Sequence, residues 1–128
     1  MRKLVMVIDD SSTVRKIIET SLKREGFDCV TFADGIEAIS ALNKGQCIPD
    51  LVILDIGLPK MDGYEIARHL KTKSQLSNTV IVMLSGRDGV IDRLKGRLAG
   101  AKDYITKPFR TQDVMAVVHN HLSLPTYS

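Results

Sequence analysis

A chain of 128 residues with a net charge of +3 has the length of one compact domain, and its mild basicity is weak evidence for nucleic-acid binding. Hydrophobic residues make up 44% and charged residues 26%, which allows a sizeable core and excludes a disordered, collagen-like or coiled-coil chain. The two cysteines, Cys29 and Cys47, have no metal-ligand spacing, so we expect free thiols in a reducing compartment.

The first predicted element is an apolar run over Leu4–Ile8 that ends at Asp9 and Asp10. This run is too short for the apolar core of a signal peptide, and no apolar stretch is long enough to cross a bilayer. We therefore interpret the run as a buried strand, and we expect a cytoplasmic protein that does not insert into membranes.

The rest of the chain alternates between helical spacing and further apolar runs. Apolar residues from Val14 to Leu22 follow helical spacing, and Gly26 ends that helix. Four more strand–helix pairs follow it. The strands are predicted at 29–32, 51–54, 80–84 and 104–106, and the helices at 36–42, 64–70, 90–98 and 114–122.

The predicted strands are apolar throughout and do not alternate with polar residues. This pattern is typical of a parallel sheet with helices on both faces, and right-handed crossovers leave few topologies for it. The predicted fold class is α/β, a doubly wound five-stranded parallel sheet. We expect one domain over residues 1–128 with its core at about 3–122, and no second domain after the last helix.

Chemically active side chains follow four of the five predicted strands. In an open parallel sheet, ligands bind beyond the carboxyl ends of the strands. Asp9 and Asp10 follow the first strand, Asp55 ends the third, Ser85 ends the fourth, and Lys107 follows the fifth. We therefore expect these five side chains to lie together at one edge of the sheet.

Three of these side chains are acids, and their crowding predicts a metal site. Like charges at close range disfavour joint ionisation, and a divalent cation among Asp9, Asp10 and Asp55 would resolve that conflict. Ligands that are all oxygen select a hard ion, and Mg²⁺ fits best. A role for the two N-terminal acids as helix caps alone is less favoured, because Ser11 can supply the cap.

Lys107 and Ser85 have weaker signals when each is taken alone. A lysine past a strand is usually solvated, and a serine before a glycine is usually a turn residue. Pro108, however, restricts the backbone of the residue before it and so directs the lysine side chain. Opposite the acids, the ammonium of Lys107 would neutralise part of their charge and hold a phosphoryl oxygen.

Together the motifs resemble the receiver domains of two-component response regulators of the chemotaxis CheY type, from Lys3 to about Leu122. In chain order the matching motifs are the acidic pair Asp9-Asp10, the phosphoacceptor segment 51–63 around Asp55, the switch hydroxyl Ser85, the switch aromatic Tyr104 and the signature Lys107-Pro108-Phe109. The Lys-Pro bond of this family is usually cis. Segment 85–98 further resembles receivers of pilus-motility and phototaxis chemosensory systems.

The resemblance implies a fold and a function. The fold would be flavodoxin-like, (βα)5, with strand order 2-1-3-4-5. The function would be that of a stand-alone response regulator: Asp55 accepts a phosphoryl group from a histidine kinase or phosphotransfer protein. Mg²⁺ would be held by Asp9, Asp10, Asp55 and the backbone carbonyl of Gly57, and Lys107 and Ser85 would hold phosphoryl oxygens.

The resemblance also implies a switch that controls the binding of a downstream effector protein. Ser85 would move toward the phosphoryl group, and Tyr104 would rotate inward to fill the space. The surface of the fourth helix, fifth strand and last helix would repack as a result. The protein would not be an enzyme in the usual sense, since it would catalyse only its own phosphorylation and dephosphorylation, and it would not bind nucleic acid directly.

Basic residues gather around that same predicted surface. They are Arg87, Arg93, Lys95, Arg97, Lys102 and Arg110, and Asp88, Asp92 and Asp103 offset them only in part. A solvated surface is the default interpretation. The sharper hypothesis is a binding surface for an acidic partner, because the switch would act on this face.

Three alternatives remain open. A phosphatase with an aspartyl nucleophile commonly has a second acid two residues later, where this chain has Gly57, so the general acid is missing. A flavin carrier would need a neutral phosphate loop after the first strand, where Asp9 and Asp10 would repel phosphate. A docking module that has lost phosphorylation is disfavoured, because all five polar residues are present.

Overall fold

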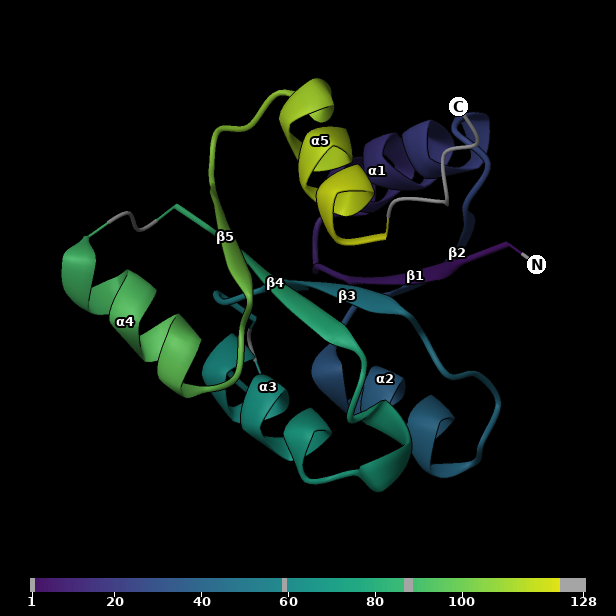
Figure 1. The fold of residues 1–128 in the computed structure, drawn as a ribbon. Helices are drawn as coiled ribbons and strands as arrows, with labels where there is room; N and C mark the ends of the chain where they lie inside the picture. Colours follow the sequence, from purple (N-terminus) through teal and green to yellow (C-terminus); the bar gives the residue numbers. More distant parts are fainter. Residues whose placement is uncertain (1, 59, 87–88, 123–128) are drawn as a thin grey trace.

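Five parallel strands form one sheet in a computed structural model of the protein, in the order β2-β1-β3-β4-β5 (Figure 1). The structure describes residues 2–58, 60–86 and 89–122. The strands are β1 (Leu4–Ile8), β2 (Asp28–Phe32), β3 (Leu51–Asp55), β4 (Val80–Ser85) and β5 (Asp103–Thr106). The helices are α1 (Ser12–Arg24), α2 (Gly35–Asn43), α3 (Gly63–Lys71), α4 (Val90–Leu98) and α5 (Thr111–Leu122). The predicted fold class and strand order are confirmed.

The predicted elements are all found, and no end differs from its prediction by more than three residues. Helices α1 and α5 begin at Ser12 and Thr111, before the first apolar residue of each pattern, because polar residues form their first turns. A short 3₁₀ helix at Ser74–Leu76 was not predicted. Pro59 of the phosphoacceptor segment, and Arg87 and Asp88 of the basic cluster, lie outside the described residues.

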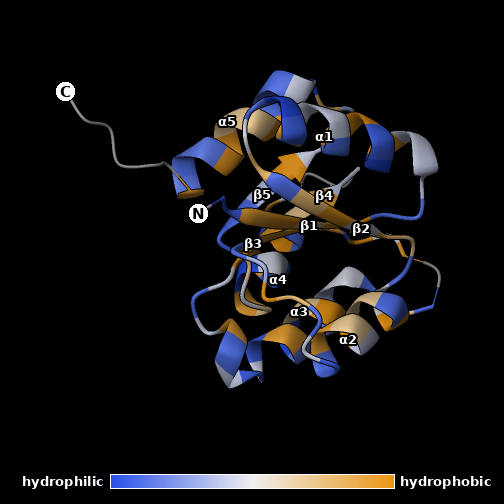
Figure 2. Cartoon of the chain, turned by 90° about the vertical axis from the view of Figure 1, so that its right-hand side faces the viewer, coloured by the Kyte–Doolittle hydropathy of each residue, from blue (hydrophilic) through white to orange (hydrophobic). Residues whose placement is uncertain are grey.

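The sheet is buried between two layers of helices. Helices α1 and α5 cover one face, while α2, α3 and α4 lie on the other (Figure 1). Alternate residues of β1 belong to the two sides: Val5 and Val7 pack with α1 and α5, and Met6 and Ile8 pack with α2 and α3. Figure 2 shows the apolar central strands between the helix layers. This double burial explains why the strands carry no polar alternation.

Side-chain caps fix where three of the helices begin. Ser11 Oγ accepts a hydrogen bond from the Val14 N–H at 3.2 Å and starts α1. Asp34 and Asp62 cap α2 and α3 in the same way. The capping role of Ser11 is confirmed, and it leaves the carboxylates of the preceding acids available for other contacts.

Both cysteines are half-buried free thiols, as the sequence predicted. Burial, with a smaller effect of the charge of Glu19, raises the pKa of the Cys29 thiol to about 12. No helix in the described part of the chain is both long enough and apolar enough to cross a membrane.

Gly63, the first residue of α3, lies against the end of β3. Its N–H donates to the Ile56 carbonyl at 3.0 Å. A Cβ at this position would lie 2.7 Å from the Ile56 Cα and 2.8 Å from the Asp55 carbonyl oxygen. A side chain here would therefore displace the backbone that carries Asp55.

We predict that Gly63→Ala lowers the free energy of unfolding by about 1–3 kcal/mol, because rigid backbone must move to admit the methyl group. Gly57→Ala is the matched control, since its Cβ would lie 3.8 Å from Asp55 Oδ1, an ordinary contact. Its unfolding free energy should stay within about 0.5 kcal/mol of wild type. Urea unfolding followed by circular dichroism measures both, and equal losses in the two variants would contradict the packing account.

Candidate functional site

The carboxyl ends of β1, β3, β4 and β5 meet at one edge of the sheet. The register pairs Ile8 with Leu54, and Ser85 with Thr106. Asp9 therefore follows β1 beside the end of β3, and Lys107 follows β5 beside the end of β4. The five side chains that the sequence singled out are brought together by this parallel alignment alone.

The three acids form one cluster. Asp9, Asp10 and Asp55 each offer a carboxylate oxygen, and these oxygens lie within 4.8 Å of one another. Asp9 has no exposed surface and Asp55 is 6% exposed, whereas Asp10 is exposed. Carboxylates so close together in a partly buried place repel one another and favour a bound cation. Hard oxygen donors of this kind fit Mg²⁺.

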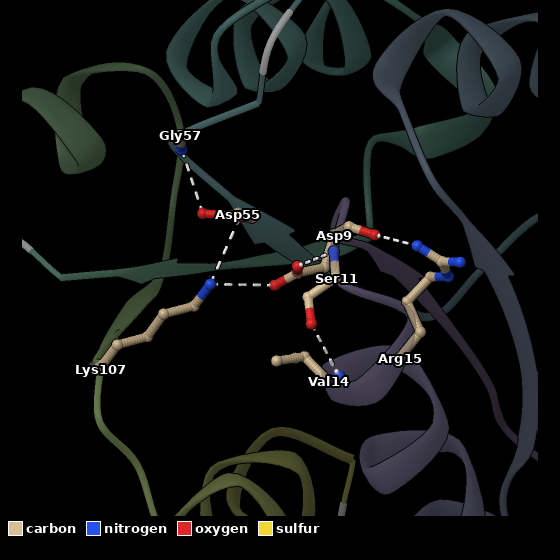
Figure 3. A network of polar contacts seen from close by, with 7 residues as sticks. All are labelled: Asp9, Ser11, Val14, Arg15, Asp55, Gly57 and Lys107. Carbon is tan, nitrogen blue, oxygen red and sulfur yellow. Dashed lines mark hydrogen bonds and ion pairs between the residues drawn. The ribbon is translucent and has the colours of Figure 1, made fainter.

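Asp9 already has hydrogen-bond partners on both carboxylate oxygens. Oδ1 accepts from the Ser11 N–H at 2.8 Å, and Oδ2 lies 3.1 Å from Lys107 Nζ (Figure 3). Its own carbonyl accepts from Arg15 Nη1 at 2.7 Å. These contacts fix Asp9 in place, so the exposed Asp10 and the cavity-facing Asp55 are better placed to bind a metal directly.

Lys107 bridges two carboxylates from different strands. Its Nζ lies 3.1 Å from Asp9 Oδ2 and 3.4 Å from Asp55 Oδ2 (Figure 3). The backbone N–H of Lys107 donates to the Ser85 carbonyl at 2.7 Å, which extends the pairing of β4 and β5 by one residue. The Lys107-Pro108 peptide bond is cis, as the resemblance implied.

The pKa values of this pair follow from burial and from the neighbouring charges. Burial raises the pKa of Asp9, and the charge of Asp55 adds to the shift, although the Ser11 N–H and Lys107 act against it. Burial opposes the charge of Lys107, but the carboxylates of Asp55 and Asp9 outweigh it and raise its pKa. Lys107 therefore stays charged at neutral pH, and its ammonium faces the carboxylates of Asp9 and Asp55.

Asp55 belongs to the acidic cluster and also lines an open cavity of about 660 Å³. Its Oδ1 accepts from the Gly57 N–H at 3.0 Å while its Oδ2 faces Lys107, so two contacts orient the carboxylate (Figure 3). The cavity is lined by Asp55, Ile56, Gly57, Leu58, Asp62, Tyr64, Ser85, Gly86, Lys95 and Lys107. A group bound to Asp55 in this cavity would meet both Ser85 and Lys107. The role of the Gly57 carbonyl as a metal ligand stays a prediction.

Some residues of the site were not found from the sequence. Lys95 was assigned to an outer basic surface, yet it also lines the cavity, since α4 packs beside the end of β4. Tyr64 lines the same cavity, and its hydroxyl donates to the Asp92 carbonyl at 3.3 Å, which ties α3 to α4. Arg15 holds the turn after β1 through the Asp9 carbonyl. None of the three stands in a motif that marks it.

Known proteins resemble this chain in both sequence and fold. A family model described as the response regulator receiver domain matches residues 5–119. Protein PilG of Pseudomonas aeruginosa is 38% identical over 118 residues, which cover 92% of this chain and 86% of PilG. Every residue of the site described above lies inside the matched ranges of the family model.

Solved structures with the same arrangement of elements include two that cover nearly the whole chain. Chemotaxis protein CheY4 of Vibrio cholerae has a TM-score of 0.88 at 27% identity, over 95% of this chain and 100% of CheY4. The BeF3-activated receiver domain of DrrB from Thermotoga maritima has a TM-score of 0.85 at 30% identity, over 97% of this chain and 100% of that domain.

We predict that Lys107→Met binds Mg²⁺ more tightly than wild type, on the order of tenfold, because the ammonium that now offsets Asp9 and Asp55 repels an incoming cation. Isothermal titration calorimetry measures the dissociation constant. Lys102→Met is the matched control, because Lys102 is exposed and precedes β5 at the opposite edge of the sheet. Equal or weaker binding in Lys107→Met would show that the metal binds away from this cluster.

Proposed function

The chain belongs to the family of response regulator receiver domains, and we propose that it is a response regulator whose Asp55 accepts a phosphoryl group. The observation that carries the proposal is the position of the Asp55 carboxylate. It is part of an acidic cluster suited to Mg²⁺, and it lines a cavity together with Ser85 and Lys107. The donor would be the phosphohistidine of a kinase or a phosphotransfer protein.

The side chains around Asp55 suit an in-line transfer. An Asp55 oxygen would bond to phosphorus as the phosphorus–nitrogen bond to the donor breaks, and the donor nitrogen would keep the electron pair and take up a proton. The contacts from Gly57 and Lys107 hold the carboxylate in one orientation before the donor arrives. Lys107 would then hold one phosphoryl oxygen as an ion pair, and the Ser85 hydroxyl would donate to another.

The metal would supply charge neutralisation. Bound Mg²⁺ offsets the negative charge that develops on phosphoryl oxygens. We assign its ligands to Asp10, Asp55 and the Gly57 carbonyl, with Asp9 beside them in contact with Lys107. The buried, doubly engaged carboxylate of Asp9 and the exposed one of Asp10 support this division of roles.

Contacts between Ser85, Thr106 and Arg93 suggest how phosphorylation of Asp55 would change the surface of α4. Ser85 pairs with Thr106 across the sheet, and Arg93 Nη2 lies 3.3 Å from Thr106 Oγ1. The Arg93 guanidinium carbon lies 5.1 Å from the centroid of the Tyr104 ring. If Ser85 moved toward a phosphoryl group and Tyr104 rotated inward, Arg93 would lose this contact and α4 would change its surface. The equilibrium between two forms would be shifted by phosphorylation.

A phosphatase is the enzyme that this site would fit next best. It would use Asp55 as a nucleophile and would need an acid to protonate the leaving group. Gly57 offers none, and Asp62, which lines the cavity, uses its Oδ1 to cap α3. The receiver family and the position of Lys107 favour a phosphoacceptor. The likeness to CheY4, which is named as a chemotaxis protein, suggests that the partners of this chain belong to a chemosensory system.

We predict that the protein gains the mass of one phosphoryl group when it is incubated with acetyl phosphate and Mg²⁺. Asp55→Asn should gain none, because the nucleophilic oxygen is lost. Removing Mg²⁺ with a chelator should slow the gain strongly, because charge on the phosphoryl oxygens would go unbalanced. Intact-mass spectrometry measures all three.

Asp28→Asn is the matched control for that experiment, since Asp28 is an exposed acid at the opposite edge of the sheet. It should be phosphorylated as wild type is. Phosphorylation of Asp55→Asn, or the failure of the wild-type protein to react, would refute the assignment of Asp55.

A further inference from the structure

The side chain of Asp10 has no hydrogen-bond or ion-pair partner among the residues that the structure describes. Its carboxylate is exposed, although one of its oxygens lies within 4.8 Å of carboxylate oxygens of Asp9 and Asp55. The carboxylates of Asp9 and Asp55, by contrast, are each oriented by contacts of their own. The place of the Asp10 carboxylate in the cluster therefore depends on the backbone that carries it.

Contacts from other groups fix the peptide units on both sides of Asp10. The unit that follows Asp10 is held by the Ser11 N–H, which donates to Asp9 Oδ1 at 2.8 Å. The unit that precedes Asp10 is held by Arg15 Nη1, which donates to the Asp9 carbonyl at 2.7 Å. Since two planar peptide units define the φ and ψ angles of the residue between them, these contacts set the direction in which the Asp10 side chain leaves the backbone.

Arg15 reaches the Asp9 carbonyl from near the start of α1. Helical side chains point toward the N-terminal end of their helix, so a long side chain there can contact the turn that precedes it. In the described part of the chain, no other donor binds this carbonyl. Asp9 has no exposed surface, and a buried carbonyl without a donor is unfavourable. Loss of the guanidinium therefore favours a rearranged turn.

The two cations that contact Asp9 bind different groups from opposite sides. Lys107 approaches the carboxylate from the side of Asp55, and Arg15 approaches the carbonyl from the other side (Figure 3). Burial raises the pKa of Asp9, and the side-chain charges that alter it further are those of Asp55 and Lys107. We therefore expect Lys107 to act on the site through its charge and Arg15 to act through the backbone.

We propose that Arg15 is a positioning residue of the metal site, whose hydrogen bond to the Asp9 carbonyl holds the Asp10 carboxylate toward the same cation as Asp55. This inference rests on the proposed function, in which Asp10 is a metal ligand. Side chains that orient metal ligands typically contribute a factor of about 10 to 100 in metal affinity. Arg15 touches neither the metal nor the phosphoryl group in this account.

Two simpler roles of Arg15 predict different results. If Arg15 acted only as a positive charge near the acids, its removal would tighten Mg²⁺ binding, because a cation that repels the metal would be lost. If it acted only on the stability of the fold, its removal would leave the affinity of the folded protein for Mg²⁺ unchanged. A positioning residue differs from both, since its removal weakens Mg²⁺ binding although a positive charge is lost.

The first test measures Mg²⁺ binding by isothermal titration calorimetry, with circular dichroism to confirm that each variant is folded. Arg15→Met should raise the dissociation constant about tenfold. Lys16→Met is the matched control and should bind as wild type does, because it removes the same charge from an exposed neighbour on α1. Arg15→Lys keeps the charge on a shorter side chain and should also bind more weakly than wild type. That variant carries the test if Arg15→Met does not fold.

The second test needs no metal. The ¹⁵N relaxation of the backbone amides of Asp10 and Ser11 reports motion of the turn on the picosecond to nanosecond timescale. In metal-free Arg15→Met, these amides should become more mobile than in wild type, while that of Ile18 in the middle of α1 should not change. In metal-free Lys16→Met, all three amides should behave as in wild type.

A double variant tests whether the effect passes through Asp10. In an Asp10→Asn background, Arg15→Met should weaken Mg²⁺ binding by less than about twofold further, because the ligand that Arg15 positions is already lost. A further loss as large as in the wild-type background would show that Arg15 acts elsewhere and would overturn the inference.

The outcomes distinguish this inference from the proposed function. Mg²⁺ binding by Arg15→Met that equals or exceeds that of wild type, unchanged mobility of the Asp10 amide, or an equal loss in Lys16→Met would each overturn the positioning role. Phosphorylation of the wild-type protein, measured by intact mass, would leave the function standing in each case. If Arg15→Met gives the expected results but the wild-type protein is not phosphorylated, the function is overturned and the positioning role stands.

Discussion

The ammonium of Lys107 lies between the carboxylates of Asp9 and Asp55, which come from different strands, and the site depends on this bridge. Parallel strands put all their carboxyl ends at one edge, so acids that end neighbouring strands must crowd together there. Burial further disfavours the charged form of Asp9, and it raises the pKa of this carboxyl group. The fold thus concentrates negative charge that one lysine only partly offsets. That excess is what makes the edge suited to a divalent cation and, through it, to phosphoryl oxygens.

The site and the surface of α4 are joined by a short series of contacts. Ser85 lines the cavity beside Asp55 and pairs with Thr106, and Thr106 meets the side chain of Arg93. Arg93 in turn lies over the ring of Tyr104. In the proposed switch, these contacts would carry a change of charge at Asp55 to the helix. The two-state behaviour that such a path requires is part of the proposal.

The sequence predicted the sheet well because each strand is buried on both faces and is apolar throughout. It also predicted that Asp9, Asp55 and Lys107 lie together, because the carboxyl ends of parallel strands all lie at the same edge of the sheet. It could not predict the orientation of α4. Spacing at 90, 91, 94 and 98 identifies a helix, and such a face is usually buried, yet here it is exposed. The helix approaches the sheet through Gly96, where a Cβ would lie 3.4 Å from the Tyr104 ring and 3.5 Å from the Met83 side chain.

Other features depend on three-dimensional packing that no local pattern encodes. Gly63 must lack a side chain because the loop after β3 folds back onto the Asp55 carbonyl, a contact set by the whole β3–α3 connection. Lys95 faces the cavity as well as the outer surface because α4 lies next to the end of β4. Arg15 reaches the Asp9 carbonyl because α1 begins immediately after that turn. The role of each of these residues depends on its neighbours in space, which the local sequence does not specify.

A crystal structure of the protein with Mg²⁺ and beryllofluoride tests the central claim most directly. The account predicts beryllium bonded to an Asp55 oxygen, with Lys107 Nζ and Ser85 Oγ on its fluorines, the metal among the three acids, and the Tyr104 ring turned inward from Arg93. Beryllofluoride on another side chain, or a metal bound away from Asp10 and Asp55, would contradict it.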